Sequence, residues 1–254
     1  MRDLTDKVAW ITGAGTGIGR AGSLALAAAG MKVVLSGRRR EKLEEVVAAI
    51  APGPGEALAE PLDVADRAAV DDVAERLAAR FGRLDVLVNS AGLNVLERHW
   101  ENLTPEGFDQ VVAINLNGAF YCCFAALPMM RAQGDGLVVN VSSWAGVRHS
   151  FLTGPAYGAS KFGLGALTEN INIEEGLNGI RATAICPGEV ATEILDRRPI
   201  PVSEADKARM VQAEDTGEII LFLARLPANV CINELVVSPT WNRTYVAAAK
   251  HFRG

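Results

Sequence analysis

The chain carries a tyrosine and a lysine four residues apart, within Tyr157-Gly-Ala-Ser-Lys161. This spacing places a phenol and an ammonium on one face of a helix. A neighbouring cation favours the phenolate and lowers the pKa of a tyrosine from its usual value of about 10. A phenol tuned in this way is the general acid/base that carbonyl reduction requires. Because any helix can carry this pair by chance, its meaning depends on the residues around it.

Two other polar residues are candidates for the same site. Ser143 precedes Tyr157 by 14 residues and directly follows an apolar run, 137–142, that reads as a strand, so its hydroxyl can lie at the same sheet edge. A serine at that place is also a common turn residue. Asn115 lies within a long uncharged helical run, where a buried amide is costly unless it is hydrogen-bonded. A structural and a functional role fit Asn115 equally well.

A glycine-rich turn, Thr12-Gly13-Ala-Gly15-Thr-Gly17-Ile-Gly19, links the first predicted strand to a predicted helix. Glycines let backbone N–H groups approach a diphosphate closely, and the helix N-terminus adds partial positive charge. The spacing of Gly13, Gly17 and Gly19 differs from the commonest dinucleotide-binding pattern. A tight joint between strand and helix would use the same residues, but the place after a first strand favours a cofactor loop.

The end of the second predicted strand distinguishes between two cofactors. NAD-binding proteins place an acidic residue about 20 residues after the glycine turn to hold the ribose 2′-hydroxyl. This chain has Ser36-Gly37 there, followed by three arginines at 38–40. Because the guanidinium fork binds phosphate through paired hydrogen bonds, Arg38 and Arg39 predict NADP rather than NAD. The alternative is a solvated helix start, although cations at a helix N-terminus oppose the macrodipole.

The hydrophobic pattern predicts the elements that position these residues. Short β-branched runs alternate with stretches of helical period. The predicted strands are 8–12, 32–36, 84–89, 137–142, 180–186 and 232–237. The predicted helices are 18–30, 41–51, 67–81 with Asp66 as its N-cap and Gly82 after its end, about 157–176, and 215–225. A further helix is capped by Thr104 and continues through the uncharged run 110–130. Strands that are apolar throughout and alternate with helices indicate parallel β-α-β units. We therefore expect one α/β domain over 1–254, a doubly wound parallel sheet (Rossmann) with helices on both faces.

Composition excludes several classes of protein. The 254 residues carry a formal net charge of −5, which argues against nucleic-acid binding. The four cysteines have no CxxC spacing and the three histidines lie far apart, so we expect no metal site. The charged start 1–7 and the absence of an apolar segment after it predict a cytoplasmic protein. The run 110–130 has the length of a membrane span, but its asparagines and proline favour a buried helix, so we expect no membrane association.

Five motifs in a fixed order resemble those of the short-chain dehydrogenase/reductase family, over residues 6–240. The motifs are Thr12–Gly19, Asn89-Ser-Ala-Gly92, Asn115 within 114–118, the serine and Tyr157/Lys161 set, and Pro187-Gly188 with Val190 and Thr192. Gly146, three residues after Ser143, marks that serine as the family's catalytic one. The resemblance also implies that the protein is a homotetramer or homodimer.

The family resemblance implies a role for each matching residue. Tyr157 would transfer the proton, Lys161 would lower the Tyr157 pKa and hold the nicotinamide ribose, Ser143 would bond the substrate oxygen, and Asn115 would hold a water that relays protons. The implied cofactor-binding residues are Gly13, Thr16, Gly17, Ile18, Gly19, Arg38, Arg39, Asp63, Val64, Asn89, Ala91, Gly92, Tyr157, Lys161, Pro187, Gly188, Val190 and Thr192.

Within the family, the chain is closest in pattern to NADP-dependent serine and 3-hydroxy acid dehydrogenases, on Gly37-Arg-Arg39 and the segment 226–240. We therefore expect a small polar substrate, a secondary alcohol such as a 3-hydroxy acid and its carbonyl compound. The alternatives are a 3-oxoacyl carrier-protein reductase and a non-catalytic NADP-sensing protein. A lid is expected over 189–214. Arg148 or His149 is a candidate partner for a substrate carboxylate, although both read equally well as surface residues.

Overall fold

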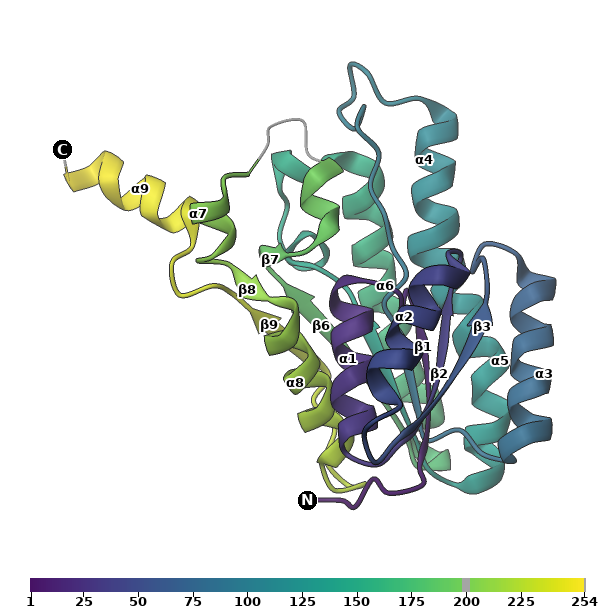
Figure 1. Ribbon diagram of the computed structural model, residues 1–254. Helices are drawn as coiled ribbons and strands as arrows, with labels where there is room; N and C mark the ends of the chain where they lie inside the picture. Colours follow the sequence, from purple (N-terminus) through teal and green to yellow (C-terminus); the bar gives the residue numbers. More distant parts are fainter. Residues whose placement is uncertain (198–201, 254) are drawn as a thin grey trace.

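One seven-stranded sheet, in which all neighbouring strands run parallel, forms the centre of the fold (Figure 1). This computed structural model describes residues 1–197 and 202–253. The strands are β1 (Val8–Thr12), β2 (Lys32–Gly37), β3 (Glu56–Pro61), β4 (Val86–Asn89), β5 (Gly136–Val141), β6 (Ile180–Pro187) and β9 (Glu234–Val237). Their order across the sheet is β3-β2-β1-β4-β5-β6-β9. The chain reverses its direction of winding between β1 and β4, so the predicted doubly wound α/β fold is confirmed.

Helices cover both faces of the sheet. They are α1 (Gly17–Ala28), α2 (Arg40–Ile50), α3 (Arg67–Phe81), α4 (Pro105–Val112), α5 (Gly118–Gln133), α6 (Gly154–Glu175), α7 (Glu204–Lys207), α8 (Ala213–Arg225) and α9 (Arg243–Arg253). One hydrophobic core joins the sheet to α1, α2 and α8, and a second joins it to α3, α5 and α6. In Figure 1, α3 and α5 lie at the right of the molecule, and α1 and α8 lie on the other side, toward the left.

The strands alternate their side chains between these two cores. In β1, Ala9 and Ile11 belong to the first core, whereas Val8 and Trp10 belong to the second. Each of these four side chains is almost fully buried. Period-two alternation with apolar residues on both faces is what a sheet covered on both sides requires. The continuous apolar runs in the sequence are therefore explained by burial on two faces.

Capping residues in the sequence predicted most helix ends to within a few residues. Asp66 accepts a hydrogen bond from the Ala69 N–H at 3.2 Å and begins α3, and Gly82 closes that helix with φ of 66°. The predicted start of α8 was two residues late, because Asp215 is at position N3 of a capping box whose N-cap is Gln212. The predicted start of α6 was three residues late, because Pro155 is accommodated in the first turn of the helix.

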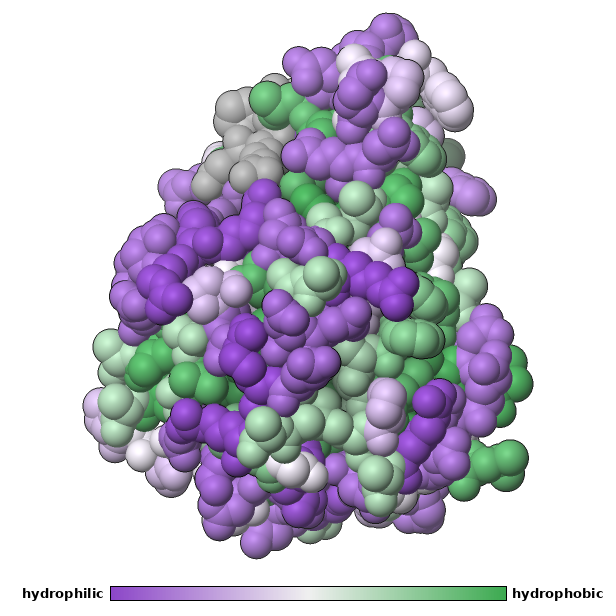
Figure 2. All heavy atoms as spheres, turned by 90° about the vertical axis from the view of Figure 1, so that its right-hand side faces the viewer, coloured by the Kyte–Doolittle hydropathy of each residue, from purple (hydrophilic) through white to green (hydrophobic). Residues whose placement is uncertain are grey.

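The uncharged run 110–130 lies within a long helical segment that α4 and α5 form with a π-helical turn, Ala113–Asn117, between them. This segment, 105–133, is long and apolar enough to cross a membrane by length and composition, as is true of many core helices. One face of α5 is buried through Cys122, Cys123, Ala126 and Met130, while Phe120 and Phe124 are 45% and 58% exposed. Figure 2 faces the side of α3 and α5, and hydrophobic patches lie there between hydrophilic residues.

The chain between β6 and α8 forms a separate small unit beside the sheet. Its ends pair as a two-stranded parallel sheet of β7 (Val190–Ala191) and β8 (Val211–Gln212). A 3₁₀ helix, Glu193–Arg197, and α7 lie between these strands. The predicted lid, 189–214, covers this unit, and its residues 198–201 lie outside the described part of the chain. Neither the small sheet nor α9 was predicted from the sequence.

Candidate functional site

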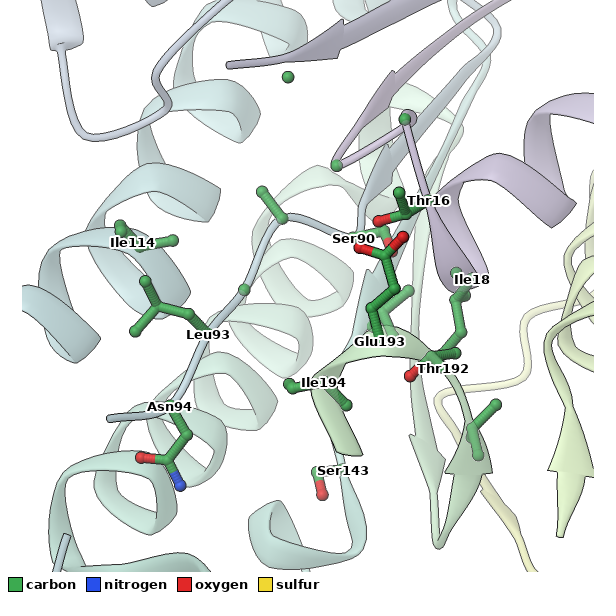
Figure 3. Close-up of a pocket in the computed structure, with 18 of the residues that line it drawn as sticks. Thr16, Ile18, Ser90, Leu93, Asn94, Ile114, Ser143, Thr192, Glu193 and Ile194 are labelled. Atoms are coloured by element: carbon green, nitrogen blue, oxygen red, sulfur yellow. The ribbon is translucent and has the colours of Figure 1, made fainter. Parts of the chain in front are cut away.

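A cavity of about 650 Å³ lies at the carboxyl ends of the strands, where the loops after β1, β2, β3, β4, β5 and β6 meet. Figure 3 shows this cavity between the segment after β4, which carries Ser90 and Asn94, and the segment after β7, which carries Glu193 and Ile194. The predicted residues that line it are Gly13, Thr16, Gly17, Ile18, Arg38, Arg39, Asp63, Val64, Ala91, Gly92, Ser143, Tyr157, Lys161, Pro187, Gly188, Val190 and Thr192. Gly19, Asn89 and Asn115 lie behind the wall. In the described part of the chain, no group of His, Cys, Asp or Glu gathers that could hold a metal ion.

The glycine turn is shaped by close backbone approach. Gly13 has φ of 65°, and a Cβ on it would lie 2.8 Å from the backbone of Ser90 and Ala91. A Cβ on Gly19 would lie 2.4 Å from the Gly13 carbonyl oxygen, so Gly19 lets the first turn of α1 pack against the end of β1. The first turn of α1 contains no acidic residue. Its N–H groups therefore face the cavity with the partial positive charge that attracts phosphate.

The segment after β4 is held against this turn by side chains of the neighbouring strands. The N–H groups of Ser90 and Ala91 both donate to the Thr12 hydroxyl, each at 3.2 Å. Asn89 is buried and donates to the Asn140 side-chain oxygen at 2.9 Å. These contacts give Asn89 a role in fixing the strand ends, with Ala91 and Gly92 presented to the cavity.

The arginines after β2 differ in their positions. Arg38 and Arg39 line the cavity, while Arg40 begins α2 and pairs with Glu44 one turn later at 3.6 Å. The Arg39 guanidinium also donates to Glu193 at 3.2 Å, and both side chains are more than half exposed. Figure 3 shows the Glu193 carboxylate directed across the cavity toward Thr16 and Ser90. An acidic side chain of the predicted lid thus lies within reach of the predicted phosphate-binding arginine.

Tyr157 and Lys161 lie on the face of α6 that borders the cavity. The Lys161 ammonium is 5.6 Å from the centre of the Tyr157 ring and donates to the Val141 carbonyl oxygen at 2.8 Å. Only 4% of Lys161 is exposed. Burial lowers the pKa of the Lys161 ammonium from 10.5 to about 8. The predicted pair is thus brought together, with the cation at the buried end of β5.

Asn115 is 1% exposed and lies in the π-helical turn between α4 and α5. Its side chain accepts from the Leu93 N–H at 2.8 Å and donates to the Leu93 carbonyl at 2.9 Å and to the Ser160 hydroxyl at 3.2 Å. A Cβ on Gly92 would lie 3.3 Å from the Asn115 oxygen and 3.7 Å from the Lys161 nitrogen. Asn115 therefore joins the segment after β4 to α6, beside the buried ammonium. π-Helical turns are often found at functional sites.

The two serines after β5 face different surroundings. Ser142 is buried, and its hydroxyl donates to the Lys161 carbonyl oxygen at 3.1 Å. The Ser143 hydroxyl accepts from the Ala145 N–H at 3.1 Å, which leaves its proton to donate toward the cavity. A Cβ on Gly146 would lie 2.5 Å from the Ser142 oxygen and 2.7 Å from the Lys161 carbonyl oxygen. Gly146 thus allows this loop to pack against α6.

The structure places Arg148 and His149 outside the cavity. The Arg148 guanidinium lies 5.4 Å from the centre of the Trp144 ring, and His149 stacks on Phe162 at 5.2 Å. Both residues are exposed, so the surface interpretation of them is correct.

Arg98, which sequence analysis missed, lines the cavity and is only 5% exposed. The backbone of Arg98 packs directly against Gly154 at the start of α6, three residues before Tyr157. A Cβ at position 154 would lie only 1.9 Å from the Arg98 carbonyl oxygen. Between Glu97 and His99 this arginine has the sequence context of a solvated loop, and no local signal marks it.

Comparison with known proteins agrees with this geometry. The family description "short chain dehydrogenase" matches residues 7–200. The chain belongs to this family. It is 33% identical to an uncharacterised oxidoreductase of Staphylococcus aureus (strain USA300) over 94% of this chain and 100% of that one. It is 40% identical to levodione reductase of Leifsonia aquatica over 76% of this chain and 72% of that one. The closed form of a serine dehydrogenase complexed with NADP+ superposes with a TM-score of 0.82 at 28% identity, covering 91% of this chain and 94% of that one.

Membership of the short-chain dehydrogenases makes this chain an oxidoreductase that acts on alcohol or ketone groups of small molecules. The predicted family resemblance is confirmed. The cavity at the carboxyl edge is where a doubly wound sheet binds its ligands.

The buried ammonium of this short-chain dehydrogenase predicts how its stability depends on pH. Because the folded pKa of Lys161 is about 8 and the unfolded value is 10.5, the folded state holds the ammonium at a cost below pH 8. The unfolded state binds more protons between these values, so this cost shrinks as the pH rises through that window. Lys161→Met removes the cost, roughly 3 kcal/mol, and loses the bond to Val141, worth about 1 kcal/mol.

We therefore expect Lys161→Met to be about 1–2 kcal/mol more stable than the parent at pH 7. The advantage should vanish by about pH 10, as measured by urea unfolding at both pH values. Lys32→Met, at a partly exposed lysine paired with Asp6, is the control and should not be more stable than the parent at pH 7. A Lys161→Met advantage that is the same at pH 7 and pH 10 would contradict the assignment.

Proposed function

We propose that this chain catalyses the NADP-dependent interconversion of a secondary alcohol and its carbonyl compound, with Tyr157 as the general acid/base. The observation that carries the proposal is the convergence of the glycine turn, the two arginines and the Tyr157–Lys161 pair on one cavity. Two relatives support it: a serine dehydrogenase is complexed with NADP+, and another is named for reducing levodione.

The residues of the cavity fit a dinucleotide with a 2′-phosphate. The glycine turn admits a diphosphate to the N-terminus of α1, where the first turn has no acidic residue. β2 ends at Ser36-Gly37 with no carboxylate to hold a free 2′-hydroxyl, and Arg38 and Arg39 lie at that end of the cavity. We assign Asp63 and Val64 to the adenine and Val190 and Thr192 to the nicotinamide, and all four residues line the cavity.

When bound, NADP donates or accepts the hydride. The Tyr157 hydroxyl gives the proton to the substrate oxygen during reduction and takes it back during oxidation. The Lys161 ammonium favours the phenolate by its charge and holds the nicotinamide ribose. Ser143 donates a hydrogen bond to the same substrate oxygen, and Asn115 holds the water that relays protons to Lys161.

Replacement of Tyr157 tests this mechanism. Tyr157→Phe removes the acid/base group and keeps the ring, so we expect reduction of a ketone panel with NADPH to fall by about 10²–10⁴-fold. The Kd for NADPH should stay within about two-fold, measured by fluorescence titration. NADH is run in parallel, and a higher kcat/KM with NADH would overturn the choice of NADP. Tight NADPH binding with no turnover by the parent would favour a sensing protein instead.

Glu193 and a 2′-phosphate would compete for the same guanidinium. Because Arg39 and Glu193 form an exposed pair, worth about 0.2–1 kcal/mol, Glu193→Gln should tighten NADPH binding by up to about five-fold. NADH has no 2′-phosphate, so its Kd should not change. Glu44→Gln, which removes the partner of Arg40 outside the cavity, is the matched control. An equal gain with both cofactors would exclude competition at Arg39.

For the substrate, we propose a small polar alcohol such as a 3-hydroxy acid. Arg98 supports an anionic substrate, because it is a buried cation that lines the same cavity as Tyr157. Its five N–H donors allow it to bind a carboxylate while keeping other contacts. Asn94, which donates to the Thr153 carbonyl at 2.9 Å, holds this segment against the start of α6.

A comparison of charged and neutral substrates tests the role of Arg98. We expect Arg98→Gln to lower kcat/KM by about 10-fold or more for 3-oxo acids and by less than two-fold for the matching esters. Arg148→Ala is the control, because this arginine lies outside the cavity and should not distinguish the two. An equal loss on acids and esters would show that Arg98 does not recognise a carboxylate. Faster turnover of acyl thioesters than of acids would favour a carrier-protein reductase.

We further propose that the protein is a cytoplasmic homodimer or homotetramer. Phe120 and Phe124 on α5 and Phe162 on α6 expose aromatic surface that a second copy would cover. All four cysteines are free thiols, three of them buried, as is typical of a reducing compartment.

A further inference from the structure

The carboxyl-terminal segment carries contacts that the proposed function does not use. α9 begins at Arg243 and lies beside α7 in Figure 1. Asn242 is buried, and its side-chain oxygen accepts from the N–H groups of Thr244 and Tyr245 at 3.0 and 3.2 Å. The start of this helix is thus fixed in place rather than frayed.

Arg243 makes a two-pronged ion pair with Glu189. Its Nε donates to one carboxylate oxygen at 2.9 Å and its Nη2 to the other, and Asp206 of α7 lies 3.8 Å from Nη1. The bond to Glu189 raises the pKa of the Arg243 guanidinium. A cation in the first turn opposes the helix macrodipole, so α9 gains nothing locally from this arginine. The closest contacts of Arg243 are with Glu189, which lies in the loop after β6.

Glu189 lies between two residues of the cavity wall, Gly188 and Val190. Its carbonyl accepts from the Val211 N–H of β8 at 3.2 Å, while its carboxylate holds α9. The peptide before it is also fixed, because the Gly188 N–H donates to the Val237 carbonyl at 2.7 Å. Glu189 therefore joins the cavity loop, the far end of the predicted lid and the carboxyl-terminal helix.

A second contact from α9 is made with the loop after β5. The Tyr245 ring lies 5.7 Å from the Trp144 ring, centre to centre. Trp144 directly follows Ser143, and its ring edge would lie 3.5 Å from a Cβ on Gly188. The same short helix therefore contacts the loop of the predicted catalytic serine and the loop that carries Val190.

We propose that Arg243 is a positioning residue for the proposed reaction, and that α9 holds two loops of the cavity together. We call this role of α9 the clasp. Through Glu189 it fixes the loop 187–192 at the distance from Ser143 at which nicotinamide and substrate meet. Tyr245 fixes the serine loop to the same helix through Trp144. This role rests on the proposed function, because the fixed loop is the one assigned to the nicotinamide.

The test replaces Arg243 and compares binding, turnover and stability. Arg243→Met should raise the Kd and KM for NADPH by about 10-fold and lower kcat less, because the loop that holds the nicotinamide is loosened. Arg243→Lys keeps the charge but loses the guanidinium that bonds both carboxylate oxygens. It should therefore recover only part of the lost NADPH binding. The exchange Glu189→Arg with Arg243→Glu restores an ion pair and should recover more activity than either single change.

A matched ion pair elsewhere separates positioning from simple stability. Arg131 of α5 makes the same kind of two-pronged pair with Glu175 of α6. Arg131→Met should lower the Tm and leave the Kd for NADPH unchanged. If Arg243→Met changes Kd and KM by less than two-fold, or no more than Arg131→Met does, the clasp is excluded. If the parent shows no turnover, the proposed function fails, while the Kd comparison still decides the clasp.

Discussion

The ammonium of Lys161 is the constraint around which the candidate site is built. An isolated buried charge is costly, and here one hydrogen bond to Val141 offsets part of that cost. The part of the cost that this bond does not offset is seen in the lowered pKa of the Lys161 ammonium. Such a group keeps its place only where the surrounding backbone is held tightly. Gly92 and Gly146 supply that tightness, because a Cβ on either would press against Lys161 or its direct neighbours.

Much of this arrangement was predictable from the sequence, because its causes are local. The strand pattern gave six of the seven strands of the main sheet to within two residues at each end. The apolar runs among them occur where a strand is buried on two faces. Asp66, Gly82 and Thr104 placed helix ends through their capping chemistry. Parallel strands collect the residues that follow them at one edge, which predicted the place of the cavity. The individual residues that line it were implied by the family resemblance.

What could not be predicted depends on contacts distant in sequence. Arg98 is a cavity residue only because Gly154, 56 positions later, lets the backbone of Arg98 cross the start of α6. The π-helical turn at Asn115 leaves no mark in the hydrophobic period. The partnership of Glu189 with Arg243 joins residues 54 positions apart. Each is set by tertiary packing, which overrides or ignores local preference.

The two walls of the cavity are held by different kinds of interaction. The wall that carries Tyr157 and Lys161 is fixed by hydrogen bonds between buried groups, whose loss would leave polar atoms unpaired. The opposite wall is held at Gly188 and Glu189 by backbone hydrogen bonds and the ion pair with Arg243, but at Glu193 only by a largely exposed ion pair with Arg39. Exposed pairs are worth about 0–1 kcal/mol and weaken with salt. The wall that carries Tyr157 and Lys161 is therefore rigid, while the opposite wall can shift at small cost only around Glu193.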